Sequence, residues 1–288
     1  MDASVFSETL NNLIKKKNSM LCVGLDTDIE QIPSSLLSEV DPLFFFNKEI
    51  VEATGEYVCA FKLNIAFYES LGLPGWELLE KTLAVIPKEV LIIADAKRGD
   101  IGNTSRKYAE TFFKTYSFDC ITVSPFMGLD SLEPFLEYKD KGIFILCITT
   151  NSGAQDFQRL QVQGETTSTP LYLKIARKVV EWNFNFGNCG LVVGGTQLGE
   201  IEDVRKVALN LPFLVPGIGA QGGNLELAVK YATDDEGFSS IISASRSVVY
   251  ASSEMDFAEV ARERAKQIRD QINMFVRIHK NPDLLEKN

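Results

Sequence analysis

Four charged residues follow one apolar run in the segment VLIIADAKRGDIGN, which covers residues 90–103. The charged residues are Asp95, Lys97, Arg98 and Asp100. A charge cluster at the end of a strand is often only a solvated surface. Carboxylates and ammonium groups held together can instead stabilise a charged transition state and deliver a proton. The elements that would position these side chains decide between the two interpretations.

Eight short apolar runs predict strands, and amphipathic stretches between them predict helices. Most of the runs are continuously apolar, which is typical of parallel strands covered on both faces. Alternating strands and helices, at about 30 residues per unit, favour a single-domain (β/α)8 TIM barrel over residues 1–288. A doubly wound open sheet is the structural alternative. The expected strands cover residues 20–26, 57–64, 90–96, 120–126, 142–150, 189–195, 212–218 and 239–245.

Two helices are expected outside these repeats, one before the first strand and one over residues 254–278. One connection, residues 151–170, is polar and unusually long. Long loops in compact domains tend to be lids or binding loops. The sequence therefore predicts a functional loop after the fifth strand.

Composition narrows the class of protein. The 288 residues carry a net charge of −10, which argues against nucleic acid or an anionic membrane as a partner. The sequence contains no apolar run that resembles a signal peptide or a membrane span, so we expect a cytoplasmic protein. The five cysteines are widely spaced and lie in or beside apolar segments: Cys22, Cys59, Cys120, Cys147 and Cys189. Small core residues in a reducing compartment are the interpretation we favour.

The remaining polar residues collect where the expected strands end. In a barrel, the active site lies at the carboxyl ends of the strands. Asp26 ends the first expected strand, Lys62 lies near the end of the second, and Asp95 and Lys97 end the third. Because alternate side chains of a strand share a face, Asp95 and Lys97 should point the same way. Buried charges persist only when they are paired, so we expect an interlocked Lys–Asp array at the barrel mouth.

A second group of residues predicts a phosphate site. VPGIGAQGG, residues 215–223, follows the seventh expected strand and leads into a helix near Asn224. Glycine turns let backbone N–H groups approach a phosphate, and a helix N-terminus adds a favourable dipole. Arg246 follows the eighth strand and supplies a forked donor. The two places match the phosphate site common in such barrels, so a phosphorylated substrate is expected.

The motif DAKRGDIGNT resembles the D-x-K-x-x-D-[IV]-x-x-T signature of the orotidine 5′-phosphate decarboxylase family. Asp26, Lys62 in FKLN, the PGIG turn and Arg246 follow in the order of that family, so the resemblance covers nearly the whole chain. The long loop after the fifth strand and the run SPFMGLDSLEPF are similar to the longer of the family's two main sequence groups. The resemblance implies decarboxylation of orotidine 5′-phosphate to UMP, the last step of pyrimidine nucleotide synthesis.

The resemblance also implies catalytic roles. Lys62, Asp95, Lys97 and Asp100 would form an alternating Lys–Asp–Lys–Asp array that works without a cofactor or a metal. Lys97 would be the proton donor. Asp100, like Thr104, would reach into the partner's site in a homodimer with shared active sites.

Substrate contacts follow from the same resemblance. Asp26 and Lys62 would hold the ribose hydroxyls, and Thr150 or its neighbours would contact the pyrimidine edge. The phosphate would be held by Gly219, Gln221 and Arg246.

Four other functions compete with this one. A metal-dependent pentose-phosphate epimerase needs histidine ligands, and the single histidine, His279, lies far from any strand end, where we expect it to be exposed. A Schiff-base aldolase needs a lysine of lowered pKa, whereas carboxylates flank Lys97. A phosphate-binding barrel without catalysis should lack a member of the array, and all four are present. A Mg²⁺-dependent decarboxylase of a related phosphosugar acid, of the ketogulonate-phosphate type, is the strongest alternative.

Overall fold

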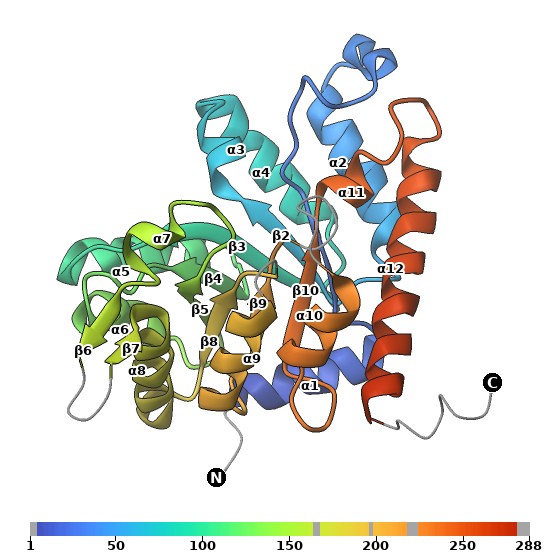
Figure 1. Ribbon diagram of the computed structural model, residues 1–288. Coiled ribbons are helices and arrows are strands. Elements are labelled where there is room, and N and C mark those ends of the chain that lie inside the picture. The colour runs from blue at the N-terminus through green and yellow to red at the C-terminus, as the bar shows by residue number, and fades with distance from the viewer. Residues whose placement is uncertain (1–4, 164–167, 196–197, 218–223, 281–288) are drawn as a thin grey trace.

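Eight parallel strands close into a barrel in the order β1-β10-β9-β8-β5-β4-β3-β2, with helices outside it (Figure 1). The computed structural model describes residues 5–163, 168–195, 198–217 and 224–280. The closed barrel confirms the predicted fold and excludes the open sheet. Its strands are β1 (Leu21–Gly24), β2 (Ala60–Asn64), β3 (Leu91–Arg98), β4 (Cys120–Val123), β5 (Gly142–Ile148), β8 (Cys189–Val193), β9 (Phe213–Val215) and β10 (Ser240–Ala244).

Each strand lies within or across one of the eight predicted runs, but most are shorter. Most predicted strands extended too far because apolar residues continue into the loops, where the hydrogen bonds between strands have already ended. β3 is the exception, because it extends past Asp95 to Arg98 and so carries charged residues inside the strand itself.

The helices run between and around the strands, and the predicted first and last helices are both present. Asp41 caps α2 by accepting a hydrogen bond from the Phe44 N–H, and Gly187 ends α8 in the left-handed conformation that favours glycine. The helices are α1 (Val5–Lys17), α2 (Pro42–Thr54), α3 (Ile65–Glu69), α4 (Leu73–Val85), α5 (Gly102–Glu110), α6 (Leu129–Leu136), α7 (Ala154–Phe157), α8 (Leu171–Phe186), α9 (Leu198–Val207), α10 (Leu225–Ala232), α11 (Arg246–Val249) and α12 (Phe257–Lys280).

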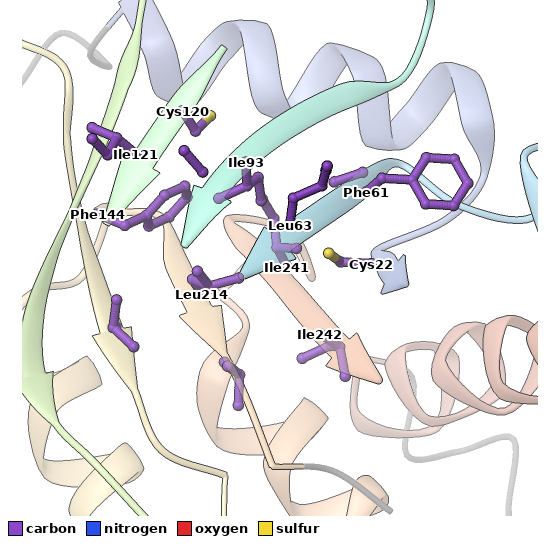
Figure 2. Close-up of a cluster of buried hydrophobic side chains, with 14 of the residues drawn as sticks. Cys22, Phe61, Leu63, Ile93, Cys120, Ile121, Phe144, Leu214, Ile241 and Ile242 are labelled. Carbon is purple, nitrogen blue, oxygen red and sulfur yellow. The ribbon is translucent and has the colours of Figure 1, made fainter. Parts of the chain in front are cut away.

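Buried apolar side chains from neighbouring strands pack against one another in the core (Figure 2). Phe61, Ile93, Phe144 and Ile241 are fully buried there. A Cβ at position 190 would lie 2.7 Å from the ring of Phe144, so glycine in β8 makes room for that ring. All five cysteines are buried and free, as predicted.

The barrel floor, where the strands begin, is held by a buried arginine. Arg205 is 9% exposed and lies in the last turn of α9. Its guanidinium stacks 3.5 Å from the centroid of the Phe213 ring. Five backbone carbonyl oxygens accept hydrogen bonds from it, those of Ala208, Leu209, Leu211, Ala232 and Ser239. One side chain therefore ties α9, α10 and the start of β10 together.

The connection after β5 has secondary structure of its own. It contains α7 and a small antiparallel pair, β6 (Gln161–Gln163) with β7 (Ser168–Pro170). The sequence predicted only a polar loop here, because strands of three mostly polar residues are too short to show an apolar pattern. Within the part of the chain that the structure describes, no helix combines the length and apolar surface needed to cross a bilayer.

Candidate active site

Three adjacent strands bring their charged residues together at the mouth of the barrel. Gly24 of β1 is in register with Lys62 of β2, and Asn64 of β2 is in register with Asp95 of β3. The Lys62 Nζ lies 3.0 Å from Asp95 Oδ2 and 3.7 Å from Asp26 Oδ1. Lys97 Nζ lies 2.6 Å from the other oxygen of Asp95. The predicted array of Lys62, Asp95 and Lys97 is therefore a continuous chain of ion pairs.

Burial and the neighbouring charges change the pKa values within this series of ion pairs. The Lys62 side chain is 6% exposed, and burial alone would lower its pKa, but Asp26 and Asp95 outweigh that effect and raise it. Burial would likewise raise the pKa of Asp95, yet Lys62 and Lys97 hold it well below its usual range. Both groups are consequently charged at neutral pH. Lys97 is different, because 48% of its side chain faces solvent.

The backbone at Lys97 departs from a regular strand. Lys97 has a φ of 47°, in the left-handed region that non-glycine residues rarely occupy. The pairing of β3 with β4 also shifts between Ala94 and Arg98. Asp95 and Lys97 do meet, as predicted, but a bulge brings them together rather than the simple alternation of a strand.

Asp26 is fixed by contacts from two sides. Its Oδ1 accepts a hydrogen bond of 3.2 Å from the Asn64 N–H, and its backbone carbonyl accepts one of 3.1 Å from the Tyr250 hydroxyl. A Cβ on Gly24 would collide with the side chain of Ser245, the residue before α11. The ends of β1 and β10 therefore approach closely, which places Arg246 beside the Asp26 segment.

Asp100 and Thr104 do not join the array within one chain. Asp100 is half-buried, and its Oδ1 accepts a hydrogen bond of 2.8 Å from the Ile101 N–H. No ion pair links Asp100 to any residue that the structure describes. Thr104 is exposed on α5.

The predicted substrate contacts are only partly described. Arg246 is exposed at the start of α11, and Thr150 is half-buried just after β5. Gly217, in the predicted phosphate-binding segment 215–223, has a φ of 92°, a conformation that favours glycine. Gly219 and Gln221 lie outside the described residues.

Comparison with known proteins identifies a family for the chain as a whole. A model of the "Orotidine 5'-phosphate decarboxylase / HUMPS family" matches residues 19–262. The chain belongs to this family.

Members of the family resemble the chain over nearly its full length. An orotidine 5′-phosphate decarboxylase of Dehalococcoides mccartyi is 48% identical over 270 residues, which cover 94% of this chain and 98% of the relative. One from Christiangramia forsetii is 47% identical over 270 residues, covering 92% and 97%. The structure of the Leishmania donovani OMP decarboxylase is 36% identical, with a TM-score of 0.79 over 92% of this chain and 98% of that one. As a member, the chain is an enzyme of the carbon–carbon lyase class.

Two features of this family member were not predicted from its sequence. The Thr122 hydroxyl of β4 contacts both Asp95 and the Lys97 backbone, and Tyr250 ties the Asp26 segment to α11. A threonine within an apolar strand next to β3 was the available signal for the first. The second feature had no signal in the sequence, because Tyr250 lies 224 residues from Asp26.

His279 was expected to be exposed, and that prediction was wrong. Its side chain is 19% exposed on α12, with Nε2 3.7 Å from Glu226 Oε1. Burial and the nearby Lys230 lower its pKa. Among the described residues, His, Cys, Asp and Glu side chains form no group of three or more with the geometry of a metal site.

Proposed function

We propose that the enzyme decarboxylates orotidine 5′-phosphate to UMP, the last step of pyrimidine nucleotide synthesis. The observation that carries the proposal is the ion-pair chain Lys62–Asp95–Lys97 at the barrel mouth, 3.0 and 2.6 Å between charged atoms. The names of the relatives support the same substrate.

The chemistry explains why such a chain is needed. When the bond between C6 and the carboxylate breaks, CO₂ leaves and its electron pair stays on C6. The ring carbonyls cannot delocalise that pair, so a nearby positive charge must stabilise it. The Lys97 ammonium supplies that charge and then transfers its proton to C6, which completes UMP. Because half of the Lys97 side chain faces solvent, water can return the proton after turnover.

Asp95 keeps Lys97 ready for this step. Its carboxylate stays ionised because Lys62 and Lys97 hold its pKa low, and it holds the Lys97 ammonium by an ion pair of 2.6 Å. A buried carboxylate at this place also repels the carboxylate of the substrate, and loss of CO₂ relieves that repulsion.

Substrate binding is assigned to the groups around the array. Asp26 and Lys62 would hold the ribose hydroxyls, Thr150 the pyrimidine edge, and Arg246 with Gly219 and Gln221 the phosphate. Arg246 is free to bind an anion, since its side chain is exposed and pairs with no acidic residue that the structure describes. Phosphate binding far from C6 can then support the chemical step.

The test is to follow orotate absorbance after adding orotidine 5′-phosphate, with and without EDTA. We expect absorbance to fall at the same rate in both arms, because the mechanism uses fixed side-chain charge and no metal. Loss of activity in EDTA, restored by Mg²⁺, would instead show a metal-dependent mechanism, as expected for the ketogulonate-phosphate type of decarboxylase. No fall in absorbance in either arm would overturn the proposal.

We further propose a homodimer in which Asp100 and Thr104 complete the partner's site. The absence of an ion pair between Asp100 and the described residues of its own chain supports this. Ile101 and Phe126, in the segments after β3 and β4, are 58% and 86% exposed, and burying such apolar side chains against a partner would be favourable. The free, buried cysteines support a reducing, cytoplasmic location.

Mixing inactive variants tests the shared site. Lys97→Ala and Asp100→Ala are unfolded, combined in equal amounts and refolded, so about half of the dimers should contain one chain of each kind. One of the two sites in such a dimer would hold both intact residues, which restores about a quarter of wild-type activity. Mixing Lys97→Ala with Asp95→Ala is the matched control, and it should restore nothing because both residues serve their own barrel. No recovery in either mixture would place Asp100 in its own site.

A further inference from the structure

β3 carries more residues than β4 at the level of the charged array. Ala94 is paired with Ile121 and Arg98 with Val123, so Asp95, Ala96 and Lys97 lie opposite the single residue Thr122. Extra residues of this kind lose their ladder partners and bend the strand. The left-handed backbone of Lys97 lies inside this bulge. The chain therefore needs other contacts to hold an unfavourable conformation at its proton donor.

Thr122 makes two such contacts with one hydroxyl. The residue is 1% exposed. Its Oγ1 lies 3.0 Å from the Lys97 N and 2.9 Å from Asp95 Oδ1. A backbone N–H can only donate, so the hydroxyl must accept there, and its own proton is left for the Asp95 carboxylate. The hydroxyl thus replaces the missing ladder bond and fixes the rotation of the carboxylate.

The opposite side of the bulge is held as well. Arg98 donates a hydrogen bond of 3.2 Å to the Ala96 carbonyl and pairs with Glu69. Those two interactions hold the backbone of the bulge, but neither of them involves Asp95. Thr122 alone, among the described side chains, joins the backbone of Lys97 to the carboxylate that pairs with its ammonium.

We propose that Thr122 is a positioning residue whose hydroxyl orients the Asp95 carboxylate and the Lys97 backbone, and through them the Lys97 ammonium. The proposal rests on the proposed function, because it concerns the reaction performed at Lys97. A purely structural threonine would need to satisfy only the Lys97 N–H. The second contact, to a reacting-site carboxylate, is what assigns it a role in catalysis.

Thr122→Val and Thr122→Ser separate the hydroxyl from the shape of the side chain. Valine keeps the shape, so KM should change little, while kcat should fall by up to about 100-fold, the loss expected when a catalytic group moves by about 1 Å. Serine keeps the hydroxyl and should retain most of the wild-type kcat. Thr54→Val is the matched control, because Thr54 is also buried but donates to the Ile50 carbonyl within α2. It should lower stability and leave kcat unchanged.

Crystal structures of the same variants give a readout that does not depend on turnover. In Thr122→Val, Lys97 should leave the left-handed region and lose its contact with Asp95, and in Thr122→Ser both should remain. A wild-type kcat in Thr122→Val, or equal losses in the valine and serine variants, would overturn the proposal. Inactive wild-type protein would overturn the proposed function instead, and the crystal structures would still decide the role of Thr122. If Thr122→Val does not fold, Thr122→Cys replaces it, since a thiol is a weak donor.

Discussion

Two buried cations lie at opposite ends of the barrel, and the chain compensates them differently. Lys62 at the mouth lies between the carboxylates of Asp26 and Asp95, which raise its pKa despite burial. Arg205 at the floor is surrounded by carbonyl oxygens, and burial lowers its pKa to about 9 although Asp234 and Asp235 oppose the shift. Carboxylates neutralise a full charge, whereas carbonyl dipoles satisfy hydrogen bonds without neutralising it.

The different surroundings of the two cations suggest different roles, in the reaction at the mouth and in holding the fold at the floor. The mouth has charges of both signs, whose balance would change when the carboxylate of the proposed substrate binds. The floor has one cation whose five acceptors belong to three segments of backbone, so its removal leaves the acceptors buried and unpaired. We therefore expect substitutions at the mouth to affect turnover and substitutions at the floor to affect folding.

The largest effect should come from Lys97→Ala. Loss of the proposed proton donor should lower kcat by about 10²–10⁴-fold, while UMP binding and thermal unfolding stay close to wild type because the side chain is half exposed. Kinetics and a UMP titration measure the two effects. Lys107→Ala, which removes a surface ion pair with Glu110, is the control and should change neither. Near-normal kcat in Lys97→Ala would assign proton transfer to another group.

Arg205→Met should show the opposite behaviour. Five carbonyl oxygens lose their donor, so the free energy of unfolding should fall by about 3 kcal/mol or more. Urea denaturation measures this loss, and kcat per folded molecule should be unchanged. Arg205→Lys keeps the charge but has too few donors for every acceptor, so it should recover only part of the stability. A fall in kcat per folded molecule would contradict the division between mouth and floor.

Arg246→Ala should act through the phosphate group of the substrate rather than at C6 itself. With orotidine 5′-phosphate, kcat/KM should fall. The corresponding free energy of activation should rise by about 2 kcal/mol, the scale of a charge-assisted contact. With the dephosphorylated nucleoside, wild type and variant should be equally slow. A difference that persists with the nucleoside would show that Arg246 does something other than hold phosphate.

The smallest effect should be the pH dependence contributed by Asp95. Its folded pKa lies below its unfolded value, so the stability it contributes is present above about pH 4 and is lost as pH falls through the folded pKa. Asp95→Asn should be less stable at neutral pH, because Lys97 loses its partner and Lys62 keeps only Asp26. The gap between the urea midpoints of the two proteins should therefore be constant above about pH 5, begin to narrow near pH 4 and go on narrowing as the pH falls further. A constant gap would show that Asp95 does not titrate in this way.

The barrel and the meeting of Lys62 with Asp95 and Lys97 were predictable from sequence. Continuous apolar runs reveal buried parallel strands, and parallel strands bring their carboxyl ends to one face. Thr122 and Arg205 were not predictable in these roles, because their partners come from other segments and depend on a bulge or on helix ends. The roles of Asp26, Thr104, Thr150, Arg246 and Asp100 in substrate binding and in the partner's site stay predictions, as do those of Gly219 and Gln221 and the single-domain organisation.

The pairing of β1 with β10 also affects how the protein matures on the ribosome. Leu21 is in register with Ile242, so more than 200 further residues must be synthesised before β1 can pair with β10. Until then β1 has one open edge, and such edges invite pairing with other chains. Asp26 and Arg246 follow these same two strands. A nascent chain interrupted before β10 therefore has both an open edge and only one of the two segments to which we assign substrate binding.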